Sequence, residues 1–157
     1  MNAPEVPVSE LRPSDAGPDS LARSAAIAIA IGRLGLGVAI FAFTRPALAG
    51  LGFDRPDAAT IALARLAGGR DIALGLHGLA ARNDRNRLAE SSAIATAVDA
   101  GDGIAFAAAI ASGELDRKAL INVPVIAAAV VAGTWVSARL TAQTHGLAAT
   151  APPSPLI

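Results

Sequence analysis

Residues 119–138 read ALINVPVIAAAVVAGTWVSA, twenty residues in a row without a formal charge. As a helix this stretch spans ~30 Å, the thickness of the hydrocarbon core of a bilayer. Apolar side chains such as Val123, Val130, Trp135 and Val136 fall on every side of that helix and leave no polar face. Because a helix on the surface of a soluble protein needs a polar face, the stretch predicts a transmembrane helix.

Three further apolar segments precede it, at residues 24–44, 58–81 and 91–113. They are long, rich in alanine and without the alternation of strands, so they predict helices. Short connectors rich in proline, asparagine and charged residues separate them. We therefore expect an all-α fold, a four-helix transmembrane bundle whose last helix covers about residues 119–139. A soluble four-helix bundle is the alternative, because alanine-rich helices also occur in water.

The composition fits a single membrane domain. Of 157 residues, 53% are apolar and 17% are charged, and the mean hydropathy is +0.49, which is more apolar than ordinary soluble proteins. Thirteen basic side chains balance thirteen acidic ones, so the chain lacks the positive charge that a nucleic acid requires, and no nucleic acid is expected as a partner. The absence of cysteine excludes disulfides and thiolate metal sites.

Proline-rich segments flank the apolar region: residues 1–22, which are also acidic, and residues 144–157. Such segments bury too little apolar surface to offset their conformational entropy, so we expect two flexible tails around a four-helix membrane domain at residues 23–143. The densest arginine cluster lies in residues 82–90, and such clusters tend to stay in the cytoplasm. We therefore expect a multi-pass protein of the bacterial inner membrane with both termini in the cytoplasm.

Seven ionisable side chains lie inside the apolar segments. One charge at the bilayer centre costs ~2.5–3.5 kcal/mol on insertion scales, so these charges must largely pair. Asp99 and Asp102 are ~60° apart on one helix face, and two carboxylates that close require cations between them. Arg33 and Arg70 are the expected partners, because a guanidinium makes planar bidentate contacts. The seven are Arg33, Arg65, Arg70, Asp71, His77, Asp99 and Asp102.

The second apolar segment points its ionisable side chains in several directions. At 100° per residue, Arg65, Arg70 and Asp71 project ~100–140° apart and cannot share one partner. Arg65 is near the start of its helix, so it either reaches outward to the lipid headgroups or joins the buried layer. His77 is nearly aligned with Arg70, and we expect it to be a hydrogen-bonded core histidine or a group near the cytoplasmic interface rather than a catalyst.

Two stripes of small residues accompany these charges. One lies on the face of Asp71, and the other runs along the first apolar segment. Because small residues permit close approach of two helices, both stripes are expected to be core contacts. The stripes are Gly68, Gly75 and Gly78 in the second segment, and Ala28, Gly32, Gly35 and Ala39 in the first.

A polar layer among apolar helices either fixes their register or lines a cavity that binds a molecule or moves protons. We expect a small integral membrane protein with a binding or interaction role, in which Arg33, Arg65, Arg70 and His77 are the candidate ligand-binding residues. The alternative is an enzyme whose candidate catalytic residues, Asp99, Asp102 and Asp71, do acid–base chemistry on a lipophilic substrate, such as isomerisation, cyclisation or epoxide opening. A proton-coupled transporter subunit is a third hypothesis.

Neither a metal nor another cofactor is expected. Asp99, Asp102 and His77 offer oxygen and imidazole ligands, but three such residues on two helices are a common coincidence. The sequence also contains no glycine loop of the kind that holds phosphates. The expected partners are the lipid bilayer, a lipophilic small molecule, and either a second copy of the chain or another membrane protein.

The stretch 64–75, which reads ARLAGGRDIALG, is followed by Asp99 and Asp102 in the next apolar segment. This pattern resembles uncharacterised families of small bacterial membrane proteins with about four helices, distantly similar to the DoxX type. The resemblance covers roughly residues 32–111. It implies a four-helix integral membrane protein and implies no particular activity.

Overall fold

The computed structural model describes residues 18–53, 55–113, 120 and 122–149. The regular structure in these residues is helical throughout, so the expected all-α class is confirmed. This part of the chain forms five helices, where the sequence predicts four. They are α1 (Pro18–Ala42), α2 (Thr44–Gly50), α3 (Ala58–Ala80), α4 (Arg85–Ala111) and α5 (Val123–Ala149).

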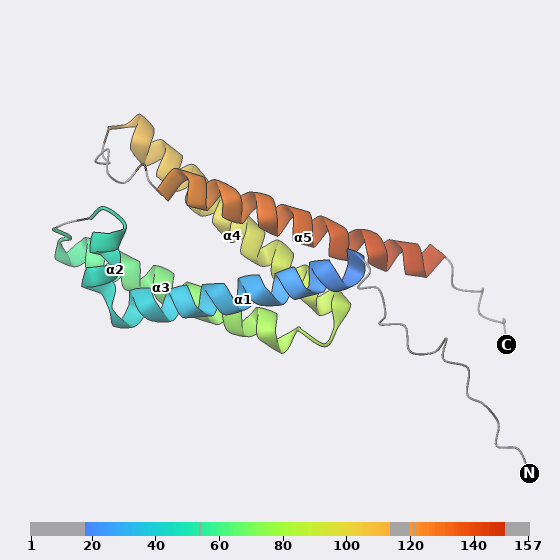
Figure 1. Ribbon diagram of the computed structural model, residues 1–157. Helices are drawn as coiled ribbons and strands as arrows, with labels where there is room; N and C mark the ends of the chain where they lie inside the picture. Colours follow the sequence, from blue (N-terminus) through green and yellow to red (C-terminus); the bar gives the residue numbers. More distant parts are fainter. Residues whose placement is uncertain (1–17, 54, 114–119, 121, 150–157) are drawn as a thin grey trace, which may run out of the picture.

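The four long helices form two antiparallel pairs (Figure 1). α1 packs along α3 and α4 packs along α5, whereas contacts between the two pairs are fewer. The pairs meet at the end of the molecule where α1 begins and the α3–α4 turn lies. The long helices diverge toward the end that holds α2, where Asn122, just before α5, donates to the carbonyl oxygen of Leu51 at 3.0 Å. A buried apolar cluster lies at the meeting end and comprises Ala22, Ala26, Ala81, Leu88, Ala89, Val136 and Leu140.

Three segments are long and apolar enough to cross a membrane: Ser20–Ala42, Arg85–Ala111 and Val123–Ala142. α3 is also long enough, but every stretch of 18 residues within it contains Arg65, Arg70 and Asp71. Large apolar side chains cover the outer surface; Val131, for example, is 69% exposed and Ile104 is 72% exposed. Soluble monomers rarely expose that much apolar surface, so this surface resembles that of a membrane protein.

Side-chain caps determine where α3 and α4 begin. Asp57 Oδ1 accepts a hydrogen bond from the backbone amide of Thr60 at 2.7 Å, and Asp84 Oδ1 accepts one from the amide of Arg87 at 3.1 Å. Each carboxylate satisfies an amide that has no partner within its helix. The hydrogen bonds from Thr60 hold the pKa of Asp57 below its ordinary value. Because Asp84 is the cap, α4 begins at Arg85, inside the segment that the sequence predicts as a connector.

The predicted helix at residues 24–44 differs from the structure at both ends. Pro46 has no amide hydrogen, and in a continuous helix its ring would collide with the carbonyl group of Ala42. α1 therefore ends at Ala42, and the short α2 follows as a separate helix. At the other end, α1 begins at Pro18, inside the expected tail of residues 1–22, because proline suits the first turn of a helix.

The last helix is longer than the sequence predicts. α5 continues to Ala149, into the segment 144–157 that is expected to be flexible. No proline interrupts the helix after its predicted end, and the next proline along the chain is Pro152. The rest of the two expected tails, residues 1–17 and 150–157, lies outside the described residues.

The small-residue stripe on α3 is a close helix contact, as expected. A Cβ atom at Gly75 would lie 2.8 Å from the carbonyl oxygen of Ala30, and one at Gly68 would lie 2.9 Å from the carbonyl oxygen of Gly37. Because any real side chain would collide with main-chain atoms at these distances, α1 and α3 approach backbone to backbone. This contact holds Asp71, on the same face of α3, against α1.

The stripe expected on α1 is not a core contact within the chain, and that expectation is wrong. Gly32 and Gly35 are exposed, and neither has another atom within 4 Å of the place where a Cβ would lie. Ala28, on the same stripe, is also exposed. The reason is rotational: α1 turns the face that holds Ala30 and Gly37 toward α3, which leaves Ala28 and Gly35 exposed and Gly32 facing the cavity described below.

Candidate functional site: an ion-pair network beside a cavity

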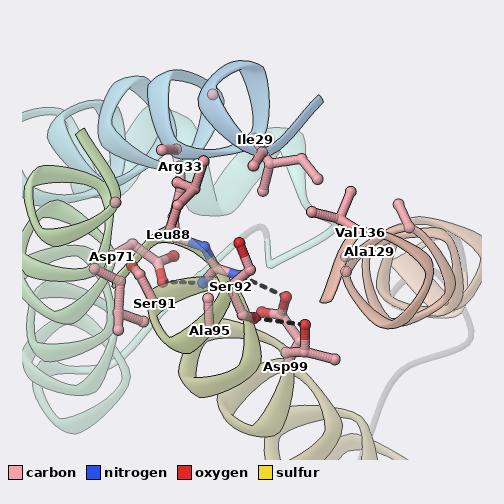
Figure 2. Close-up of a pocket in the computed structure, with 18 of the residues that line it drawn as sticks. Ile29, Arg33, Asp71, Leu88, Ser91, Ser92, Ala95, Asp99, Ala129 and Val136 are labelled. Carbon is pink, nitrogen blue, oxygen red and sulfur yellow. Dashed lines mark hydrogen bonds and ion pairs between the residues drawn. The ribbon is translucent and has the colours of Figure 1, made fainter. Parts of the chain in front are cut away.

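Arg33 joins three helices through its guanidinium group. From α1, its Nη1 atom donates to Asp71 Oδ1 on α3 at 3.0 Å, and its Nη2 atom donates to Asp99 Oδ2 on α4. Figure 2 shows the arginine reaching between the two carboxylates. The three side chains are only 10%, 11% and 15% exposed, in the order Arg33, Asp71, Asp99. The close α1–α3 contact and the position of α4 beside α1 thus create a largely buried ion-paired group.

Arg70 extends this group to the outside of the molecule. Its Nη1 and Nη2 atoms donate to Asp102 Oδ1 and Oδ2, both at 2.7 Å, which is the bidentate geometry of a strong arginine–carboxylate pair. Nη2 also lies 3.4 Å from Asp71 Oδ1. The side chains of Arg70 and Asp102 are 36% and 46% exposed. The ion-pair network therefore runs in the order Asp99, Arg33, Asp71, Arg70, Asp102.

The network leaves some hydrogen-bonding capacity unused. Among the described residues, Arg33 Nε is buried without a hydrogen-bond partner, and the contacts of Asp99 all go through Oδ2. Three carboxylates face two guanidinium groups, so the network carries one more negative than positive charge. A buried charge that is not balanced is costly in a low-dielectric surrounding. Arg33 Nε is a donor that lacks an acceptor, whereas the second oxygen of Asp99 and the surplus negative charge suit the inner end of the network to an additional hydrogen-bond donor or positive charge.

A cavity of about 260 Å³ lies beside the inner end of the network, between the two helix pairs. Its wall is mostly apolar, with Ile29 and Leu36 from α1, Leu74 from α3 and Val136 from α5. Figure 2 shows the polar side chains that join them. These polar lining residues are Arg33, Asp71, Ser91, Ser92, Thr96 and Asp99.

The hydroxyl residues of α4 are part of the wall that sequence reasoning missed. Ser92, Thr96 and Asp99 follow one another at spacings of four and three residues, which places them on one side of a helix. Hydroxyl groups at that spacing from a carboxylate, in an otherwise apolar segment, are the signal that would have identified them. Thr96 Oγ1 donates to the carbonyl oxygen of Ser92 at 2.8 Å, so its own polar atom is satisfied within α4.

The remaining candidate residues lie away from the centre of the network. Arg65 is exposed, and its Nε atom donates to Thr44 Oγ1 at 3.3 Å, near the junction of α1 and α2. His77 Nδ1 lies 3.0 Å from Ser91 Oγ, so it is hydrogen-bonded, but His77 is exposed and is not the core histidine that the sequence predicts as one alternative. Asp102 is not among the residues that line the cavity. Asp99 and Asp102 thus share a helix but belong to different surroundings.

The described residues contain no group of three or more histidine and acidic side chains placed to hold a metal ion. Asp99 and Asp102, the acidic residues considered for such a site, each hold an arginine. What the arrangement can do is present a carboxylate oxygen and a guanidinium group to a molecule that occupies an apolar cavity.

The resemblance of residues 64–75 to small four-helix membrane proteins stays a prediction. It concerns the same residues that build the network, Arg70 and Asp71 among them. No family model, no curated protein and no solved structure matches the chain.

Proposed function

We propose that this chain is an integral protein of the bacterial inner membrane that binds a lipophilic small molecule between its two helix pairs. The observation that carries the proposal is a mostly apolar cavity with ion-paired Arg33 and Asp99 in its wall. Apolar walls with a few polar groups are the usual form of a small-molecule site. The volume of about 260 Å³ lies just below the ~300–1,000 Å³ of typical sites, so the ligand is small.

The wall favours a ligand whose head group is a hydrogen-bond donor, and an amine above all. Asp99 Oδ1 makes no hydrogen bond within the described part of the chain and is free to accept one. The excess carboxylate of the network attracts a cation more strongly in an apolar surrounding than in water. An alkylammonium group satisfies both conditions, a hydroxyl group satisfies the first, and a carboxylate satisfies neither.

We also propose that α3 crosses the membrane, which makes four crossing helices with both termini in the cytoplasm. Two of its three charged side chains, Arg70 and Asp71, are ion-paired, so their cost in the bilayer is reduced. α3 also runs along α1, which is itself apolar and long enough to cross. The arginines at 82, 85 and 87 then lie at the cytoplasmic end of the molecule.

Acid–base catalysis by Asp99 and Asp102 is less favoured by this geometry. Two carboxylates divide into an acid and a base when they act on the same bound molecule. Asp99 is at the cavity and is paired with Arg33, whereas Asp102 is paired with Arg70 on the other side of the network. Binding needs no such pair of carboxylates, so a binding role fits the arrangement better than catalysis.

The proposal is tested with three probes that share a chain length but differ in charge: octylammonium, octan-1-ol and octanoate. A ligand that binds the folded state raises the melting temperature (Tm). In a neutral detergent at pH 7, we expect octylammonium to raise Tm most, octan-1-ol less, and octanoate not at all. Asp99→Asn should remove the preference for the cation, while Asp102→Asn should keep it.

A filled cavity provides the control. Ala95 lines the cavity and Ala93 is exposed on the same helix. Ala95→Phe should abolish the Tm response to all three probes, and Ala93→Phe should leave it unchanged. If octylammonium raises the Tm of Ala95→Phe as much as that of the wild type, the probe binds elsewhere and the proposal is wrong.

A further inference from the structure

The outer end of the network lies on the surface of the molecule at a depth where lipid chains are expected. Arg70 is near the middle of α3, and Asp102 is inside the apolar stretch of α4. Their side chains are nevertheless 36% and 46% exposed. Intramembrane charges in bundles face other protein or water rather than lipid chains. The described residues of one copy therefore leave this ion pair insufficiently covered.

The surface around the pair is shaped for a close helix contact. Exposed small residues follow α4 at spacings of four, four and three, namely Ala97, Gly101, Ala105 and Ala108. At Gly101 no other atom lies within 4 Å of the place where a Cβ would be, so the backbone of another helix has room to approach. On the α3 side, Leu66 is 70% exposed. The Arg70–Asp102 pair thus lies between the small residues of α4 and the exposed Leu66 of α3.

We propose that a second copy of this chain covers the surface formed by Arg70, Asp102 and the small residues of α4. A two-fold symmetric contact requires a surface that is complementary to itself. Arg70 and Asp102 supply one charge of each sign side by side, so two copies inserted in the same direction bring each guanidinium to the other copy's carboxylate at equal depth. A foreign partner or lipid would instead have to supply both charges.

This dimer does not depend on the proposed ligand. The cavity is lined by Asp99 and not by Asp102, and its wall lies between the two helix pairs of a single copy. A protein that binds no amine can still form the dimer, and a monomer can still bind the amine. The two proposals therefore fail separately.

The chain has no cysteine, so single-cysteine variants report contacts between copies without background. Ala105→Cys places a thiol on the proposed interface, and Val131→Cys places one on the outer face of α5, where Val131 is 69% exposed. With a copper–phenanthroline oxidant in native membranes, we expect several-fold more disulfide-linked dimer from Ala105→Cys than from Val131→Cys. Equal yields, or no dimer from Ala105→Cys, would overturn the proposal and leave lipid or another protein as the cover.

A charge exchange tests what holds the two copies together. In the Ala105→Cys background, one tagged copy carries Arg70→Asp and a differently tagged copy carries Asp102→Arg. Each variant alone presents like charges to itself, so we expect little cross-linked dimer from either. When the two are expressed together, we expect the mixed dimer to return to the level of the unaltered pair. Strong cross-linking of each variant with itself would show that the Arg70–Asp102 contact does not form the interface.

Discussion

Arg33 is the residue on which the inner part of the network depends. We expect Arg33→Met, which is similar in length and uncharged, to leave Asp99 without a cation in a largely buried place. Losing one partner of a buried pair costs about 3–5 kcal/mol, so the free energy of unfolding in detergent should fall by roughly that amount. Arg65→Met is the matched control, because Arg65 is exposed and donates to a hydroxyl group, Thr44 Oγ1. Similar losses in the two variants would contradict the central role of Arg33.

Among single residues, the sequence predicts which side chains form ion pairs better than it predicts where those side chains lie. Arg33 and Arg70 are expected to pair with Asp99 and Asp102, and each does pair with one of them. Asp71 is expected to project away from Arg70, yet its Oδ1 atom lies near both guanidinium groups. Helical direction is defined at Cβ, whereas an arginine side chain is long enough to bend back toward a neighbour. Helical periodicity therefore predicts the direction of each Cβ atom but not the contacts that a long side chain reaches.

At the scale of secondary-structure elements, the main feature is the close contact between α1 and α3 at the glycines of α3. A methyl group at position 75 would meet main-chain oxygen and nitrogen atoms of α1, which move only if the helix moves. We expect Gly75→Ala to lower the free energy of unfolding by about 1–3 kcal/mol, the usual cost of overpacking. Gly35→Ala meets empty space and should be neutral or stabilising by up to ~1 kcal/mol, because alanine is the better helix former. Chemical unfolding of both variants in detergent measures the difference.

If Gly35→Ala lowered the free energy of unfolding more than Gly75→Ala, the stripe of Gly32 and Gly35 would be a close helix contact after all, as the sequence predicts. That expectation failed because two small-residue faces, one holding Gly32 and Gly35 and the other Ala30 and Gly37, follow α1 together. Composition cannot choose between them. The choice is made by the direction from which α3 approaches α1, and neither face contains that information.

The existence of the long helices can be predicted from this sequence, but their ends are determined by single residues such as a proline or a capping carboxylate. The apolar runs predict four long helices, and four long helices are present in the described residues. Pro46 and Asp84 decide where α1 ends and where α4 begins, against the bounds suggested by apolar length alone. The cavity could not be predicted, because it depends on how far the two pairs diverge.

For the whole molecule, the number of membrane crossings is the first quantity to measure. If α3 crosses, the turn between α2 and α3 and the turn between α3 and α4 lie on opposite sides of the membrane. Arg55 and Asn83 are exposed in these two turns. We expect a membrane-impermeant maleimide to label Arg55→Cys from the periplasm and Asn83→Cys only in inverted vesicles. Labelling of both from one side would show that α3 does not cross.

Charge is divided unequally between the two helix pairs. In their central parts α1 and α3 carry Arg33, Arg65 and Arg70 against Asp71, whereas the central part of α4 carries Asp99 and Asp102 and no arginine of its own. Chains fold from the N-terminal end as they are synthesised, so if α3 crosses the membrane as proposed, the first pair carries a surplus positive charge that is costly in a bilayer until α4 follows. The ion-pair network is thus completed only after α4 has been synthesised.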